Sequence, residues 1–222
     1  MHVMYPKHQV DGVNDTLHPG PREPMGDPTP RVSVAGRYPV ELEADILVRT
    51  GARLHLRPIR SDDATRLVTF HHNLSFDSIY RRYFSMHPEL SPDEVVHLTE
   101  VDYVERMAFV VEDGEVLVAV GRYDRVPHSS TAEVAFVVRD DYQHLGLGHQ
   151  LLEALADAAR ERGITVFTAE TLLENRDMMS VFRHSKFPVT STISDGQISV
   201  RFSITSDDQP RAARGDQSGE GR

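Results

Sequence analysis

The sequence predicts an α/β (α+β) protein with a central mixed, mostly antiparallel and twisted sheet that is flanked by helices. Three apolar runs, at residues 106–113, 114–124 and 131–140, follow one another with turn residues between them, which predicts three successive strands. One amphipathic helix at 151–163 then leads to a further strand at 165–172. Helices, then several strands, one crossover helix and more strands indicate a mixed sheet with helices on its faces.

A hairpin and three helices are expected before these strands. Apolar and polar residues alternate over 45–59 around a Thr-Gly turn, which predicts the hairpin. Ser61, followed by two acidic residues, is the expected N-cap of a helix that continues to residue 74. A second short helix is expected at 76–84. The third begins with Ser91 and Glu94, which are spaced as a capping box.

Two further elements close the predicted fold. After the strand at 165–172 we expect a helix at 174–185. A final hairpin over 188–204 turns at Asp195-Gly196. No internal repeat is visible in the sequence.

The two ends of the chain differ in composition from the part between them. Residues 1–38 contain most of the prolines and few apolar residues, which predicts a flexible Pro-rich extension. Residues 206–222 predict a disordered tail for the same reason. One domain of usual size is left, over residues 39–205.

Composition excludes several classes of site. The chain has no cysteine, which excludes disulfides, thiolate metal sites and a cysteine nucleophile. Its net charge of −10 argues against non-specific nucleic-acid binding. The histidines show no metal-ligand spacing, so we expect no metal. No apolar run approaches the length of a membrane span and no secretory leader is visible, so we expect a cytoplasmic protein. The oligomeric state stays open.

The stretch 141–152, DYQHLGLGHQLL, predicts a phosphate site at a strand-to-helix turn. A Rossmann fingerprint would need a third glycine where Leu151 stands, and a P-loop would need Gly-Lys-Ser/Thr where His149-Gln150 stand. Free backbone N–H groups and the helix dipole could hold a pyrophosphate there without a lysine, and Gly146 and Gly148 would let it approach. A purely structural glycine turn is the alternative.

With Asn175 at the head of the next helix and Phe182 beyond it, this motif resembles the GNAT N-acetyltransferases. The resemblance covers residues 54–204 and implies the GNAT fold and acetyl-CoA as cosubstrate. In that family the motif holds the pyrophosphate, and the preceding strand and the asparagine also contact the cofactor. The implied cofactor-binding residues are Phe136, Val137, Val138, Gln143, His144, Leu145, Gly146, Leu147, Gly148, His149, Gln150, Leu151, Asn175 and Phe182.

A narrower resemblance is to the Pat-type bacterial protein lysine acetyltransferases. It is carried by the strings at 54–63, 76–85, 98–111 and 132–148. It implies a protein substrate with an exposed lysine, such as an acyl-CoA synthetase. Two alternatives stay open: acetylation of a small amine, and a non-catalytic acyl-CoA-binding module. The second is motivated by Phe182, which replaces the tyrosine that many relatives use to protonate the leaving thiolate.

Glu133 is the candidate general base. A lysine amine has a pKa of ~10.4 and must lose a proton before it attacks the thioester. Glu133 stands among apolar residues on the strand that leads to the motif, and it resembles the glutamate that Pat-type enzymes use. The alternative is a solvent-facing residue paired with an arginine such as Arg122. The resemblance also implies a backbone oxyanion donor near Phe136–Val138. Water, Ser180 or the amine's own proton would replace the missing acid.

Overall fold

The computed structural model describes residues 36–205. The predicted tail at 206–222 lies outside these residues, and so does the predicted extension at 1–38 apart from its last three residues. No helix within residues 36–205 is long and apolar enough to cross a membrane.

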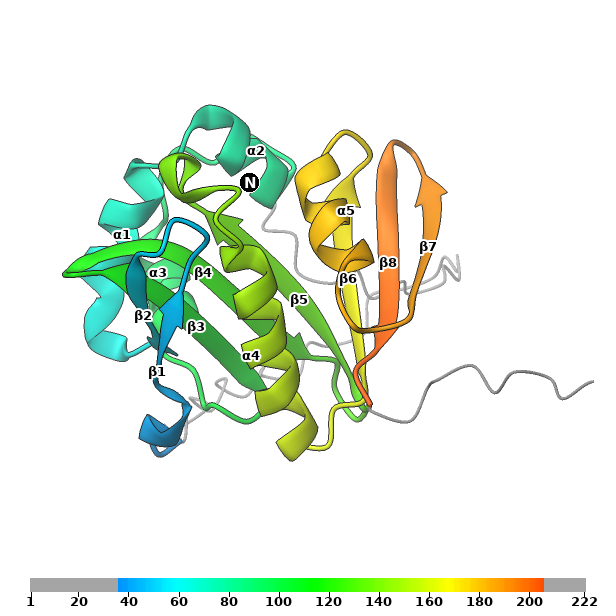
Figure 1. The fold of residues 1–222 in the computed structure, drawn as a ribbon, viewed down its shortest axis with the longest axis horizontal. Coiled ribbons are helices and arrows are strands. Elements are labelled where there is room, and N and C mark those ends of the chain that lie inside the picture. Colours follow the sequence, from blue (N-terminus) through cyan, green and yellow to red (C-terminus); the bar gives the residue numbers. More distant parts are fainter. Residues whose placement is uncertain (1–35, 206–222) are drawn as a thin grey trace, which may run out of the picture. The chain divides into compact units, whose positions relative to one another are not determined.

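Within residues 36–205, eight strands form one mixed sheet in the order β1-β2-β3-β4-β5-β6-β8-β7 (Figure 1). In this described sheet only β5 and β6 pair in parallel, and all other neighbours are antiparallel, which confirms the predicted sheet. The strands are β1 (Ala44–Leu47), β2 (Arg53–Pro58), β3 (Arg106–Asp113), β4 (Val116–Arg125), β5 (Thr131–Val138), β6 (Val166–Leu172), β7 (Val189–Ser194) and β8 (Gln197–Ser203).

Helices cover both faces of this sheet. Helix α4 packs on β3, β4 and β5, while α1 and α2 pack on β4 and β5 from the other face (Figure 1). The helices are α1 (Ala64–His72), α2 (Phe76–Tyr83), α3 (Pro92–Thr99), α4 (Leu147–Glu161) and α5 (Arg176–Arg183), with 3₁₀ turns η1 (Val40–Leu42), η2 (Ser61–Asp63) and η3 (Asp140–Tyr142).

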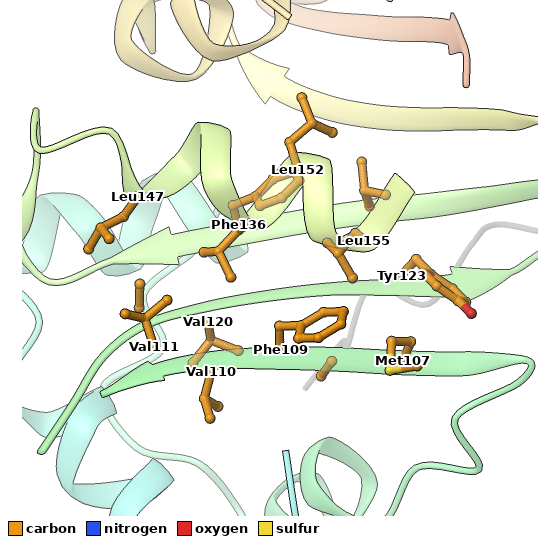
Figure 2. Close-up of a cluster of buried hydrophobic side chains, with 14 of the residues drawn as sticks. Met107, Phe109, Val110, Val111, Val120, Tyr123, Phe136, Leu147, Leu152 and Leu155 are labelled. Atoms are coloured by element: carbon orange, nitrogen blue, oxygen red, sulfur yellow. The ribbon is translucent and has the colours of Figure 1, made fainter. Parts of the chain in front are cut away.

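The core beneath α4 explains why this segment forms a helix across the sheet. Leu147, Leu151 and Leu155 recur every four residues and are fully buried, so they form one apolar stripe. Figure 2 shows Leu152 and Leu155 of α4 close to Phe136 of β5. Burying each leucine contributes roughly 1.5–3 kcal/mol to folding. This packing holds the N-terminus of α4 in place at the end of β5.

A buried ion network fixes the start of α1 and changes one predicted cap. The guanidinium of Arg57 donates two hydrogen bonds of 2.7 Å to Asp63, and a third of 3.0 Å to Glu112. Asp63 also accepts the backbone N–H of Arg60. The expectation that Ser61 caps this helix is therefore wrong. A 3₁₀ turn that begins at Ser61 precedes α1, and Asp63, at the N-cap position of α1, binds Arg57 with its carboxylate. The predicted capping box of Ser91 and Glu94 at α3 is confirmed.

His71 of α1 is a buried histidine that packs against other aromatic rings. Both ring nitrogens are buried and have no hydrogen-bond partner among residues 36–205. The ring packs edge-on against Tyr83 at 5.7 Å and His87 at 5.9 Å between ring centroids. Burial, with smaller contributions from nearby His87 and His72, lowers the pKa of His71 to about 4.

We predict that this histidine makes the fold acid-sensitive. An unfolded histidine has a pKa of ~6.5, so between about pH 6.5 and about pH 4 the unfolded chain binds a proton that folded His71 does not. The free energy of unfolding is therefore fully retained above this window and falls as the pH is lowered through it. Urea unfolding at about pH 7 and about pH 5 measures this fall, which should be smaller in His71→Leu.

His97 provides the matched comparison, because burial and nearby Arg106 also lower its pKa. The double variant of both histidines should lose more of the pH dependence than either single variant. An equal loss of stability in wild type and His71→Leu would show that the buried ring does not control this response.

Candidate active site

The site begins where β5 and β6 stop pairing. Their parallel ladder contains three residue pairs and ends at Glu133 opposite Thr168. Beyond this point β5 continues to Val138 along β4, while β6 stays paired with β8 to Leu172. The two strands therefore diverge, as Figure 1 shows, and no strand of the described chain pairs with the open edge of β5 over residues 134–138. Backbone groups on this edge are available to a ligand.

Glu133 lies at the closed end of this divergence, on the face that α2 covers. It stands opposite Asp124 of β4 and lies near Glu170 of β6. Glu133 is exposed to solvent, as the alternative interpretation expected. Partial burial of its carboxyl nevertheless raises the pKa, and repulsion from Glu170 and Asp124 adds to the rise, while Arg82 opposes it. Within residues 36–205 no ion pair includes Glu133. The alternative partner, Arg122, donates instead to the backbone oxygen of Leu98 at 2.9 Å.

A small cavity lies on the same face of the sheet as Glu133. It has a volume of about 30 Å³, and its wall includes Ala135 and Val137 of β5 together with Arg82 and Tyr83 of α2. Residues 133, 135 and 137 share this face because side chains alternate along a strand. Phe136 points the other way and is buried beneath α4. Of the predicted strand contacts, Val137 therefore lines the cavity and Phe136 can reach a ligand only through its backbone.

The loop before α4 presents a row of free N–H groups. In the part of the chain that the structure describes, none of the five backbone N–H groups of residues 144–148 donates a hydrogen bond. Gly146 is the N-cap of α4 and has a φ of 93°, and His144 has a φ of 61°. Unpaired N–H groups at a helix N-terminus, where the dipole is positive, form a site for a phosphate. We call residues 144–148 the N–H loop.

Glycine is required at the two positions of the motif for different physical reasons. Gly146 has left-handed backbone geometry, which favours glycine, and a Cβ there would meet only the Nε of Arg49 within 4.0 Å. A Cβ on Gly148 would lie 3.0 Å from Cγ2 of Val181 on α5. The sequence-based interpretation assigned both glycines to ligand approach. The structure shows that Gly148 also permits the close packing of α4 on α5.

Gln143 connects the N–H loop to α2, a link that the sequence did not indicate. Its side-chain nitrogen donates to Ser78 Oγ at 3.1 Å and to the backbone oxygen of Val138 at 3.2 Å. Ser78 in turn donates to Asp140, which also accepts two hydrogen bonds from Ser75, the N-cap of α2. Gln143, predicted as a cofactor ligand, thus uses its amide to orient the loop against α2 and the end of β5.

Other predicted ligands divide into backbone and side-chain positions. Leu147 and Leu151 are core residues whose side chains face the sheet, so only their backbone can contribute. His149, on the first turn of α4, lies 3.9 Å from Glu153. Leu145 packs against the core, and Gln150 donates its backbone N–H to Gly146.

Asn175 precedes the first turn of α5, and Phe182 lies in its last turn. Asn175 is the N-cap, and its Oδ1 accepts the Met178 N–H at 3.1 Å, which leaves its amide nitrogen for another partner. Phe182 is 1% exposed and packs between Phe136 and Phe202, with centroid distances of 6.3 Å and 5.5 Å.

The Ser180 hydroxyl, which the sequence offered as an acid, is exposed. It lies 3.2 Å from Nδ1 of His184, the C-cap residue of α5. Within residues 36–205, no cluster of three or more His, Asp or Glu side chains is placed to hold a metal ion.

The contact between Gly148 and Val181 gives a direct test of the packing of α4 on α5. Gly148→Ala should destabilise the wild-type chain more than it destabilises a Val181→Ala background, because the smaller side chain removes the clash. The expected coupling energy is about 1 kcal/mol. Thermal unfolding of the four proteins of this double-mutant cycle measures it, and simple additivity would show that the contact is not tight.

Comparison with known proteins identifies the family of this chain. The acetyltransferase (GNAT) family matches residues 75–187. The chain is 35% identical over 141 residues to Acetyltransferase Pat of Mycolicibacterium smegmatis, a match that covers 61% of this chain and 41% of that protein. It is 34% identical over 132 residues to Acetyltransferase PA5475 of Pseudomonas aeruginosa, with 58% and 71% covered. The match thus spans less than half the length of the Mycolicibacterium relative.

A solved structure has the same fold and a similar sequence. The crystal structure of the GNAT domain of S. lividans PAT is 38% identical and superposes with a TM-score of 0.71, covering 75% of this chain and 99% of that one. The family resemblance and the GNAT fold that the sequence predicted are confirmed. The chain belongs to the acetyltransferase (GNAT) family.

Proposed function

We propose that this acetyltransferase transfers the acetyl group to lysine side chains of a protein, with Glu133 as the general base. The similarity to Acetyltransferase Pat and to the PAT GNAT domain supports this acceptor class. An acyl-CoA synthetase as the acceptor, and the cytoplasmic location expected from the sequence, belong to the same proposal.

The observation that carries the proposal is the position and environment of Glu133. It stands where the β5–β6 ladder ends, next to the unpaired edge of β5. Asp124 and Glu170 are its acidic neighbours. Negative charge at this point favours the approach of a lysine ammonium, and a carboxyl with a raised pKa is a better proton acceptor near neutral pH.

The remaining residues would hold acetyl-CoA and the charge that develops on its thioester oxygen. Acetyl-CoA supplies the reactive thioester. The N–H loop would bind the pyrophosphate, and the backbone of Phe136–Val138 on the open edge of β5 would donate to the oxyanion. Glu133 would take the proton of the attacking amine. Phe182 has no proton to donate, so the thiolate would leave unprotonated or take a proton from water.

Variants of Asn175 distinguish its role as the N-cap of α5 from its proposed role in cofactor binding. Asn175→Asp keeps an oxygen for the Met178 N–H but loses the amide donors and brings a negative charge toward the phosphates. We expect the midpoint of thermal unfolding to be retained and acetyl-CoA affinity to fall. Asn175→Ala should lower both, with a cap loss of about 1 kcal/mol. Calorimetric titration with acetyl-CoA and thermal unfolding provide the two measurements.

The matched control removes a cap far from the N–H loop. Ser91→Ala removes the side-chain cap of α3, so it should lower stability without changing acetyl-CoA affinity. Full affinity in Asn175→Asp would mean that Asn175 serves its own helix only.

Glu133→Gln tests the base directly. The change keeps the size of the side chain but removes its ability to accept a proton, so turnover on lysine-bearing proteins should fall about 10²–10⁴-fold. Acetyl-CoA affinity should be unchanged. Wild-type kcat/KM should rise with pH as the carboxyl loses its proton, at a pH above the usual glutamate pKa because burial raises it. Mass spectrometry of the acceptor and thiol release give the rates.

Glu161→Gln is the control for this experiment. Glu161 is exposed at the far end of α4 and should be replaceable without loss of activity. Turnover that survives in Glu133→Gln would reject the base and keep the acetyltransferase. Turnover on free amines but not on proteins would reject the lysine acceptor.

A further inference from the structure

The turn between β1 and β2 brings an arginine to the N–H loop. The backbone N–H of Arg49 donates to the carbonyl oxygen of Leu145 at 3.3 Å, so the turn is bonded directly to the loop. The side chain of Arg49 also extends toward the loop, because its Nε lies 4.0 Å from the position that a Cβ on Gly146 would occupy. The guanidinium group therefore lies beside the N-terminus of α4.

The position of Arg49 is fixed by the hairpin. Val48 is buried, and its N–H bonds to the carbonyl of Ala52 at 3.0 Å. Gly51 closes the turn with a φ of 85° and donates to Val48 at 2.9 Å. Binding of a ligand to Arg49 would thus cost little conformational entropy, because the backbone that carries this residue is already ordered. This hairpin lies outside residues 75–187, which match the family.

Within residues 36–205, Arg49 has no carboxylate partner, unlike Arg139 and Arg81. Arg139, just before η3, forms a 2.6 Å ion pair with Asp141, and Arg81 of α2 forms a 2.8 Å ion pair with Asp77. Across residues 36–205, no ion pair includes Arg49, and its side chain is exposed. An arginine with free N–H donors next to a row of free backbone N–H groups suits a phosphate, which accepts several charge-assisted hydrogen bonds at once.

We propose that Arg49 binds the pyrophosphate of acetyl-CoA together with the N–H loop. Arg49 and the loop approach this group from two parts of the chain that are far apart in sequence. The inference rests on the cosubstrate and on the proposed place of its pyrophosphate, and it is independent of the acceptor and of Glu133.

Calorimetric titration of the full chain with acetyl-CoA tests the proposal. Arg49→Ala should weaken binding about tenfold, which equals ~1.4 kcal/mol. Arg49→Gln should weaken it similarly, and Arg49→Lys should retain part of the affinity because it keeps the charge without the planar fork. The loss should shrink as ionic strength is raised, since salt screens the attraction. The control is Arg53→Ala on the same hairpin, where Arg53 pairs with Asp45 at 3.5 Å; it should bind normally.

A second ligand identifies the phosphate. Acetyl-3′-dephospho-CoA retains the pyrophosphate but lacks the 3′-phosphate, so Arg49→Ala should weaken its binding by the same factor. A loss confined to acetyl-CoA would place Arg49 at the 3′-phosphate and overturn the proposal. Unchanged affinity in Arg49→Ala and Arg49→Gln would overturn it as well. Failure to acetylate lysine, with these affinity losses intact, would reject the proposed acceptor and leave Arg49 in place.

Discussion

The short parallel ladder between β5 and β6 is the constraint on which the site depends. Two parallel strands that are neighbours in sequence need a crossover, and here α4 provides it. The helix runs back across the sheet, so its N-terminus lies at the end of β5 that is farthest from the ladder. Because the ladder ends at Glu133, unpaired backbone on β5 and free N–H groups on α4 occur at the same end of the sheet. A longer ladder would close the opening with strand hydrogen bonds.

Local sequence predicted the elements well because local forces determine them. The alternation over 45–59, the capping box at Ser91 and the apolar stripe of α4 each depend on residues only a few positions apart. Ser61 shows the limit. It has the chemistry of an N-cap, but a buried ion network between β2, β3 and the start of α1 decides the local geometry. A tertiary contact of this kind leaves no periodic signal.

The geometry of the candidate site was predicted only in part, because some of its features depend on tertiary contacts. Gly-x-Gly before a helix indicates free N–H groups, yet the sequence cannot tell a glycine required by its φ from one required by a neighbouring side chain. The contacts of Gln143 with Ser78 and of Arg49 with Leu145 join segments far apart in the chain. Such contacts follow only from the way the sheet brings the β1–β2 turn, α2 and the N–H loop to one end.

Charge pairing separates the structural part of the fold from the reactive part. Asp63 is 2% exposed, and burial alone would raise its pKa, but Arg57 and the Arg60 N–H outweigh burial and lower it. Among residues 36–205, Glu133 has no such ion-pair partner, and its acidic neighbours add to the effect of partial burial on its pKa. An unpaired carboxylate beside two others is unfavourable, and Glu133, which is exposed, stands in this arrangement at the end of the β5–β6 ladder. A cationic substrate that approaches there would supply the missing charge.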